Sequence, residues 1–304
     1  MPNAPSYVLI TPARNEALFI EQTISSVVAQ KVLPIKWVIV SDGSTDGTDD
    51  IVHKYVREYS WIELVRTPER SERHFAAKVH AFNAGYARVK DLEYEVIGNL
   101  DADVSFCEKD YLAFLMRKFA EDRRLGVGGT PYRLENSACD SRFVNVEDVV
   151  GACQLFRREC FEEIGGYLPV KDGGVDDVAC LTARMKGWRT RSFTDRLFIH
   201  HRQSGTAQHS LLKARFRTGA LNYALGSHPI WEVFRTGYQM TKRPVVVGGL
   251  AAAAGYLWAM VRSLERSMPR ELVAFHRREQ MQRLRRLLIR SKISPVSPVV
   301  LLVL

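Results

Sequence analysis

Residues 36–50, KWVIVSDGSTDGTDD, place a short apolar run directly before a turn of small and polar residues. The run Lys36–Ser41 is rich in β-branched residues and predicts a strand, which the Asp42-Gly43 turn ends. From Thr48 to Tyr59 the apolar spacing is helical, and we expect Thr48 to be the N-cap of this helix. A strand that leads through a polar turn into a helix is the basic unit of α/β proteins.

The same alternation continues on both sides of this unit. We expect strands over Tyr7–Thr11, Ile62–Arg66 and Tyr94–Leu100, and helices over Ala17–Gln30, Ala76–Val89, Tyr111–Glu121, Arg158–Ile164 and Asp176–Lys186. The strands are almost continuously apolar, which is typical of a parallel sheet covered by helices on both faces. In such sheets ligands bind beyond the carboxyl ends of the strands. The sequence therefore predicts an α/β fold with a mostly parallel sheet and a functional site at that edge.

Composition and charge exclude several classes of protein. The 304 residues are 46% hydrophobic and 25% charged, which excludes a disordered chain, a collagen-like fibre and a coiled coil. The formal charge is +9, but residues 262–292 hold ten Lys or Arg against three Glu and so carry +7 of it. Because only +2 remains for the rest of the chain, we expect no nucleic-acid partner for the main domain.

Cysteine usage and the N-terminus both favour a cytosolic main domain. The five Cys form an odd number without a CxxC pair, which indicates buried thiols rather than a disulfide framework or a zinc site. Residues 1–17 contain no basic segment followed by a long apolar one, so we expect no signal peptide.

Acidic residues follow two of the predicted strands. Asp101 and Asp103 come directly after the strand Tyr94–Leu100, and two carboxylates so spaced can hold one Mg²⁺ or Mn²⁺ ion, which is often shared with substrate phosphates. A solvated acidic turn is the alternative for this pair taken alone. Asp42 lies at the same predicted edge and can accept hydrogen bonds from a ribose or a base. Ser44 and Asp46, by contrast, are expected only to build the turn and cap the following helix.

Seven segments, in order between residues 7 and 205, together resemble the family-2 glycosyltransferases. They are TPARNEALFIEQTISSVVAQ, VIVSDGSTDGT, KVHAFNAGY, NLDADV, LFRRECFEEIGGY, GGVDDVACLTARMKGWRTRSF and FIHHRQSG. The resemblance implies a GT-A (Rossmann-like) fold over residues 1–225, with a nucleotide-sugar-binding half (1–105) and an acceptor half (106–225). It also implies transfer of a sugar, with inversion, from a nucleotide-diphosphate donor to a hydroxyl of a glycan or lipid-linked acceptor, with Mn²⁺ or Mg²⁺ as cofactor.

The resemblance assigns roles to residues by their positions in these segments. The first loop that cradles the donor corresponds to Pro12, Ala13, Asn15 and Glu16, and the aspartate that contacts the nucleotide corresponds to Asp42. Asp103 resembles the metal-contacting aspartate, and Asp101 resembles the second member of the acidic pair, close to the donor and the metal. Lys78 is expected to reach the donor diphosphate, with a solvated helix position as the alternative. Of the pair His200-His201, His201 is preferred as a metal or diphosphate contact, and a purely structural pair is the alternative.

The catalytic base is expected in the segment GGVDDVACLTARMKGW. A carboxylate must accept the proton of the attacking hydroxyl as the bond forms. The family resembled here places this base in a Glu-Asp pair about a dozen residues before a Gly-aromatic step. Counting back from Gly187-Trp188 gives Val175-Asp176, so Asp176 is the expected base and Asp177 the second choice. Val175 stands where the family pattern has glutamate. The alternative role of Asp176 and Asp177 is to cap the helix Asp176–Lys186.

Residues 226–304 are expected to form a helical, basic and apolar region that associates with a membrane. Residues 245–261 form a run of seventeen without a charge, at the short end of the roughly 20 residues that a membrane span needs. An in-plane or re-entrant helix is therefore favoured over a single span, and a buried core helix is the third alternative. The segment Arg270–Lys292 suggests a surface helix attracted to anionic lipid, or else a dimer or packing helix. These features predict a protein at the cytoplasmic face of the cell membrane.

Two other functions fit parts of this pattern. A sugar-nucleotide pyrophosphorylase also combines an α/β sheet with metal-binding carboxylates, but it would show a glycine-rich loop where residues 12–18 are PARNEAL. A catalytically degenerate scaffold that binds nucleotide sugars at the membrane is compatible with Val175 in place of glutamate. Such a scaffold would bind the donor without turnover.

Overall fold

The computed structural model of the chain describes residues 4–68, 75–135, 146–170, 173–202, 211–241 and 245–293. It divides the chain into two compact units. Unit 1 comprises Met1–Pro169 and Val175–Arg202, and unit 2 comprises Val170–Gly174 and Gln203–Leu304. Unit 2 includes the helix over Leu211–Ala224, which packs against the helix over Val247–Val261. The boundary at residues 225 and 226 that the sequence predicts stays a prediction.

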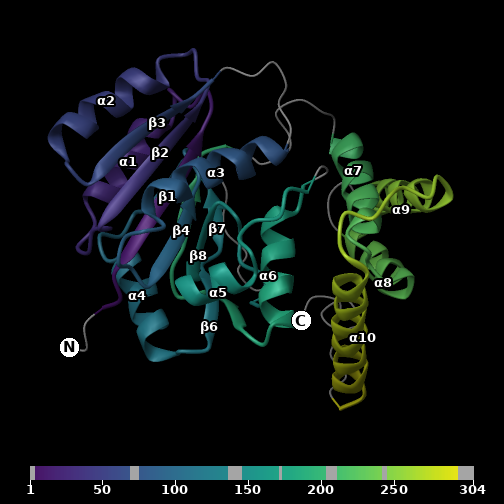
Figure 1. The fold of residues 1–304 in the computed structure, drawn as a ribbon. Coiled ribbons are helices and arrows are strands. Elements are labelled where there is room, and N and C mark those ends of the chain that lie inside the picture. Colours follow the sequence, from purple (N-terminus) through teal and green to yellow (C-terminus); the bar gives the residue numbers. More distant parts are fainter. Residues whose placement is uncertain are drawn as a thin grey trace. The chain divides into compact units, whose positions relative to one another are not determined.

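Unit 1 is built on a seven-stranded sheet in the order β3-β2-β1-β4-β8-β6-β9 (Figure 1). Its strands are β1 (Tyr7–Ala13), β2 (Lys36–Asp42), β3 (Ile62–Thr67), β4 (Val96–Leu100), β6 (Leu125–Gly129), β8 (Cys153–Arg157) and β9 (Arg189–Ser192). Strands β3, β2, β1 and β4 are parallel, as are β6 and β9, whereas β8 is antiparallel to both of its neighbours. The prediction of a mostly parallel sheet is therefore confirmed.

Strand β1 is longer than the sequence predicts. The sequence predicts an end before Pro12, but the strand continues to Ala13 and pairs there with β2. Its pairing with β4 stops at Ile10. Proline cannot donate a ladder hydrogen bond, and Pro12 lies beyond the part of β1 that pairs with β4.

Helices cover both faces of the sheet and bury a core on each side. They are α1 (Ile20–Val28), α2 (Thr48–Glu58), α3 (Phe75–Val89), α4 (Tyr111–Glu121), α5 (Arg158–Glu163) and α6 (Val175–Met185). Alternate residues of β1 go to opposite faces: Leu9 joins the core that includes Ile24 of α1, and Ile10 joins the core that includes Phe82 of α3. This alternation is what a strand covered on both faces requires.

The start of α2 corrects one prediction. Thr48 is the first helical residue, and Gly47, with a φ of 89°, occupies the N-cap. Asp46 performs the capping instead, since its Oδ1 accepts hydrogen bonds from the Thr48 amide at 3.1 Å and from the Thr48 hydroxyl at 2.5 Å. A carboxylate two residues before the helix competes well for these donors.

A small second sheet links distant parts of unit 1. Its three strands are β5 (Val104–Ser105), β10 (Phe198–His200) and β7 (Tyr132–Leu134), in the order β5-β10-β7. Strand β10 is antiparallel to β5, and His200 lies opposite Val104. This pairing places residues 200–202 beside the acidic turn that follows β4.

Unit 2 is helical. Its helices are α7 (Leu211–Ala224), α8 (Pro229–Gln239), α9 (Val247–Val261) and α10 (Arg270–Ile293). Helices α7 and α9 pack with their backbones close together: a Cβ added at Gly219 would lie 1.8 Å from the carbonyl oxygen of Ala252, and one added at Gly255 would lie 1.9 Å from that of Phe216. Among the helices of the described residues, none has both the length and the apolar character needed to cross a bilayer.

Candidate active site

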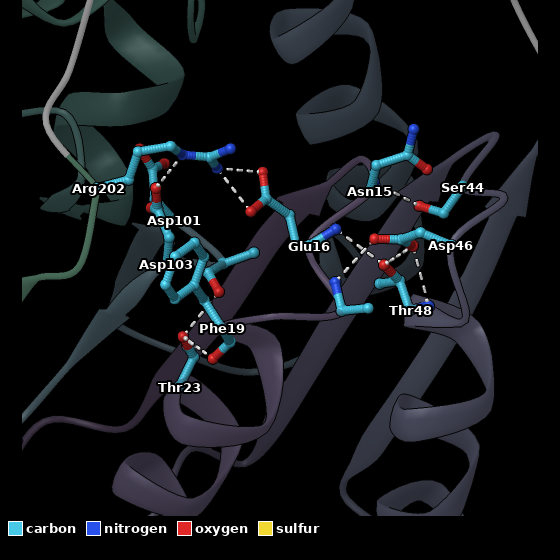
Figure 2. A network of polar contacts seen from close by, with 12 residues as sticks. Asn15, Glu16, Phe19, Thr23, Ser44, Asp46, Thr48, Asp101, Asp103 and Arg202 are labelled. Carbon is cyan, nitrogen blue, oxygen red and sulfur yellow. Dashed lines mark hydrogen bonds and ion pairs between the residues drawn. The ribbon is translucent and has the colours of Figure 1, made fainter. Parts of the chain in front are cut away.

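The loop after β1 is fastened to the turn after β2. Asn15 has a φ of 55° and donates its amide N–H to Ser44 Oγ at 3.1 Å, while its own Oδ1 accepts from the Thr45 amide at 2.9 Å. The Glu16 amide donates to Thr48 Oγ1 at 2.8 Å, as Figure 2 shows. Asp46 Oδ2 accepts from the amide of Ala17. The prediction that Ser44 and Asp46 build the turn is confirmed, and the same two residues also hold the first loop.

Asp42 is the last residue of β2, and its carboxylate is almost fully buried. Its Oδ1 accepts a hydrogen bond from the Thr67 hydroxyl at 2.9 Å, and its Oδ2 lies 3.9 Å from Nη1 of Arg14. The predicted donor-loop residues Pro12 and Ala13 lie on β1, next to β2. Asp42 thus lies at the carboxyl end of the parallel strands, as the sequence predicts.

Asp101 follows β4 and contacts a lysine of α3. Lys78 Nζ lies 2.5 Å from Asp101 Oδ1, and the same oxygen accepts from Asn99 Nδ2 at 3.1 Å. Burial lowers the pKa of Lys78, but the charges of Asp101, Asp176 and Asp103 outweigh it and raise that pKa above its ordinary value. Lys78 is therefore a fixed positive charge beside three carboxylates of the predicted site.

Asp103 is buried and bound by two side chains from the end of β10. Its Oδ1 lies 3.3 Å from Nε2 of His200, and its Oδ2 accepts from Nε of Arg202 at 3.1 Å. Burial raises the pKa of Asp103, but the contacts with His200 and Arg202 together hold it below the ordinary carboxyl value. The carboxylate is therefore ionised near neutral pH.

Arg202 joins Asp103 to the first loop. Its Nη2 donates to Oε1 and Oε2 of Glu16 at 2.5 and 2.6 Å, and its guanidinium also lies over the ring of Phe19 (Figure 2). Burial raises the pKa of Glu16, and the nearby Asp103 charge adds to this, although Arg202 opposes both. Arg202 was not singled out from the sequence, although it directly follows the histidine pair.

The two histidines have different environments. The side chain of His201 contacts Ser105 Oγ through Nε2 at 2.9 Å and Glu135 Oε2 through Nδ1 at 3.2 Å. Its ring also stacks on Phe19, with centroids 5.8 Å apart. The sequence preferred His201 as the metal or diphosphate contact, but the structure places the His200 side chain at Asp103 and leaves His201 only a backbone contact with that residue.

Asp176 lies in the first turn of α6 and is connected to Asp101 through Gly151. Its Oδ2 accepts the Gly151 amide at 2.9 Å, and the Gly151 carbonyl accepts from Asn99 Nδ2 at 2.5 Å. The same Asn99 amide group binds Asp101. The structure therefore brings Asp176 to the acidic turn, although 75 positions separate it from Asp101 in the chain. Its neighbour Asp177, the second choice for the base, is exposed.

A buried pair of residues fixes the backbone at Asp176. Gln154 of β8 is fully buried and donates its Nε2 to the carbonyl oxygens of Val149 and, at 3.3 Å, of Asp176. Its Oε1 accepts from the Tyr167 hydroxyl at 2.7 Å. Sequence reasoning missed both residues, since a glutamine within an apolar strand gives no signal of what it contacts.

The acidic turn has the chemistry of a divalent-cation site completed by phosphate. Within the described ranges, no cluster of three or more His, Cys, Asp or Glu side chains is arranged to hold a metal ion. Mg²⁺ and similar ions are, however, often held by only one or two carboxylates, with substrate phosphates as further ligands. Asp101 and Asp103 form such a pair, and the imidazole of His200 lies beside it, with its Nε2 3.3 Å from Asp103 Oδ1. The donor set therefore fits a hard divalent cation.

Comparison with known sequences finds similarity to glycosyltransferases. Residues 8–138 match the family model described as "Glycosyl transferase family 2". The chain is 30% identical over 192 residues to a probable glycosyltransferase, YdaM, of Bacillus subtilis (strain 168), which covers 55% of this chain and 44% of that protein. It is 30% identical over 125 residues to the poly-beta-1,6-N-acetyl-D-glucosamine synthase of Staphylococcus aureus (strain COL), covering 41% and 28%. The chain thus spans less than half the length of these two curated relatives.

Solved structures share the fold. The mannosyltransferase PcManGT from Pyrobaculum calidifontis, in complex with GDP-Man and Mn²⁺, matches with a TM-score of 0.58 and 20% identity, over 93% of this chain and 81% of that one. S. aureus TarS 1–349 in complex with UDP-GlcNAc matches with a TM-score of 0.53 and 15% identity, over 86% and 74%. At these identities the similarity establishes the fold.

Proposed function

Residues 8–138 match the model of glycosyl transferase family 2, and from this match we propose that the chain is a glycosyltransferase. In this proposal it moves a sugar, with inversion, from a nucleotide-diphosphate donor to a hydroxyl of a glycan or lipid-linked acceptor. One observation carries the proposal: Asp42, the pair Asp101 and Asp103, and Asp176, from three separate segments, lie at the carboxyl edge of the sheet, and the cation Lys78 lies beside the last three. Ligands bind at this edge in open α/β sheets.

The donor site is formed by the first loop and the ends of β2 and β4. The buried Asp42 carboxylate can accept hydrogen bonds from the nucleoside, beside the loop of Asn15 and Glu16. Lys78 and Arg202 supply positive charge on the side of the acidic turn, where a diphosphate would need it. Positively charged groups fixed in advance stabilise the charge that develops on a departing diphosphate.

Asp101 and Asp103 would hold the divalent ion, Mn²⁺ or Mg²⁺, with His200 as a nearby imidazole. The bound ion supplies Lewis-acid neutralisation of the diphosphate charge. The solved neighbour PcManGT, whose structure contains GDP-Man and Mn²⁺, supports this part of the proposal. Arg202, which contacts Asp103 Oδ2 and both carboxylate oxygens of Glu16, would add positive charge beside the ion.

Asp176 is the proposed base. Its Oδ2 is held by the Gly151 amide at 2.9 Å, and the buried Gln154 fixes its backbone, so the carboxylate has a defined position beside the acidic turn. There it accepts the proton of the acceptor hydroxyl while the oxygen attacks the anomeric carbon and the nucleoside diphosphate leaves. A positioned base of this kind contributes on the order of 10²–10⁴-fold to the rate.

The direct test is a transfer assay with a panel of UDP-, GDP- and dTDP-sugars. The chain is incubated with each donor and Mn²⁺, and both nucleoside diphosphate release and sugar incorporation into glycan and lipid-linked acceptors are measured. The proposal predicts release with one nucleotide class and none from the Asp103→Ala variant. Because Val175 stands where glutamate is typical of the family, a scaffold function remains the second candidate. Tight donor binding without release or incorporation would favour the scaffold.

A further inference from the structure

Helix α9 is packed in the reverse of the usual way for a helix in water. The side it turns toward the interior of unit 2 is made of small residues with one tyrosine: Gly248, Gly249, Ala252, Gly255, Tyr256 and Ala259. The side it turns outward carries large apolar side chains: Val247, Leu250, Leu257, Trp258 and Val261. A helix in water normally buries its large apolar residues, since each contributes about 1.5–3 kcal/mol when removed from the solvent.

The outward residues form one continuous face. At 100° per residue, Leu250, Leu257 and Val261 fall within a narrow sector, and Val247 and Trp258 border it. Val261 is 80% exposed, and Leu250 and Leu257 are each 52% exposed. Met260 and the preceding Val245 and Val246 are also exposed. The apolar surface is therefore too large to be a set of scattered side chains.

The interior of unit 2 holds polar side chains as well as apolar ones such as Leu272 and Leu284. Glu232 of α8 is buried, and its Oε2 accepts from Asn222 Nδ2 at 3.2 Å. Gln280 of α10 is buried as well and donates to Ser227 Oγ at 3.1 Å. Meanwhile Ile230 and Val233 of α8 are exposed. Large apolar side chains left on the outside, while polar side chains are buried, fit a helical unit that lies at an apolar boundary.

The charge of the unit identifies the kind of surroundings. Helix α10 carries eight Arg or Lys against two Glu, a net charge of +6, and Arg278, Arg285 and Arg286 are exposed. Basic residues near a membrane surface are attracted to anionic lipid headgroups. The fifteen residues of α9 extend about 22 Å, shorter than the roughly 30 Å hydrocarbon core, so α9 suits an in-plane position.

We propose that the outward face of α9, formed by Val247, Leu250, Leu257, Trp258 and Val261, inserts into the surface of an anionic lipid bilayer, with α9 in the membrane plane. Apolar insertion supplies one part of the affinity, and the basic residues of α10 supply the other. The inference rests on the packing and charge of unit 2 and not on the proposed glycosyl transfer, so each can fail without the other.

The test measures binding of the full chain to vesicles by flotation. Vesicles of phosphatidylcholine with phosphatidylglycerol are compared with vesicles of phosphatidylcholine alone, and we expect stronger binding to the anionic ones. The variant Leu257→Ser/Val261→Ser should bind them at least about tenfold more weakly, since it removes two exposed apolar side chains that the bilayer would bury. The matched control is Leu33→Ser/Ile35→Ser, which removes two exposed apolar residues of unit 1 and should bind as the wild type does.

A second readout reports the position of α9 itself. Brominated phosphatidylcholine in the anionic vesicles should quench more fluorescence of the wild type than of Trp258→Phe, because Trp258 would lie at the depth of the bromine atoms. Equal vesicle binding by the α9 variant and the wild type would overturn the proposal. The proposal would also be overturned if the wild type were a dimer and the same variant a monomer with unchanged vesicle binding. The face would then join two copies of the chain.

Discussion

The guanidinium of Arg202 donates from Nε to Oδ2 of Asp103 at 3.1 Å, although 99 positions separate the two residues in the chain. The contact exists because β10 pairs with β5, which directly follows the acidic turn. The same guanidinium binds both carboxylate oxygens of Glu16. One arginine therefore joins the first loop to the proposed metal-binding aspartate, and several measurable consequences follow from these charges.

The stability of the protein should depend on pH through Asp103. Because His200 and Arg202 outweigh burial, the pKa of Asp103 is lower in the folded protein than in the unfolded chain. The unfolded state then binds more protons near pH 4 than the folded state does. The stabilisation that the ionised Asp103 carboxylate contributes is therefore present above the unfolded pKa of about 3.9 and is lost as the pH falls. Thermal melting between about pH 3 and 6 should show a steeper acid loss for wild type than for Asp103→Asn.

The control for this prediction is Glu93→Gln, which removes an exposed carboxylate between α3 and β4. Its acid dependence should remain close to that of the wild type. Identical curves for wild type and Asp103→Asn would mean that the contacts with His200 and Arg202 do not hold the carboxylate ionised.

Lys78 should contribute to donor affinity. Its Nζ is fixed by Asp101, and a charge-assisted hydrogen bond contributes about 1.5–3 kcal/mol. Since the side chain is partly exposed, we take the lower end and expect Lys78→Gln to weaken nucleoside diphosphate binding by about tenfold. Arg88→Gln is the matched control, because Arg88 lies on the same helix and pairs with Glu63. Equal loss in both variants would indicate a general effect of charge on binding.

Replacing Asp176 should lower the rate of transfer without weakening donor binding. In Asp176→Asn the side chain keeps its shape but cannot accept the proton, so turnover should fall on the order of 10²–10⁴-fold. Calorimetric affinity for the nucleoside diphosphate should stay at the wild-type value. Asp177→Asn changes the exposed neighbour and should keep most of the activity. Wild-type turnover in Asp176→Asn would remove Asp176 from the mechanism.

Gly151 should tolerate no side chain. A Cβ at this position would lie 2.8 Å from Oδ2 of Asp176, the oxygen that its amide binds. Gly151→Ala should therefore displace the base and lower kcat by about tenfold or more, at a stability cost of about 1–3 kcal/mol. Gly237→Ala, where the added Cβ meets nothing within 4 Å, is the control for the stability measurement. Unchanged kcat with reduced stability would show that the base position does not depend on this contact.

Much of the sheet and half of the site could be predicted from the sequence. Apolar strands that end in Asp42 and in Asp101-Ala102-Asp103 have a strong local signal, and parallel strands place such ends at one edge. The antiparallel direction of β8 could not be predicted, because an apolar run does not encode its direction. His200 and Arg202 reach Asp103 because β10 pairs with β5. These strands have three and two residues and are too short to show a periodic pattern in the sequence.

The base region illustrates a second limit. The spacing from Gly187-Trp188 selected Asp176, and the structure brings it to the acidic turn. Its supports, Gln154 and Tyr167, act through buried hydrogen bonds between distant segments. Such contacts depend on three-dimensional packing, which local residue patterns do not specify.

The most direct test of the donor site is calorimetric binding of UDP, GDP, dTDP and CMP, each with and without Mn²⁺, to wild type and Asp103→Ala. Glycosyl transfer from a nucleotide-diphosphate donor predicts that one diphosphate binds in the presence of Mn²⁺ and that Asp103→Ala loses this binding. Absence of binding by every nucleotide, or binding that neither Mn²⁺ nor the substitution changes, would contradict it.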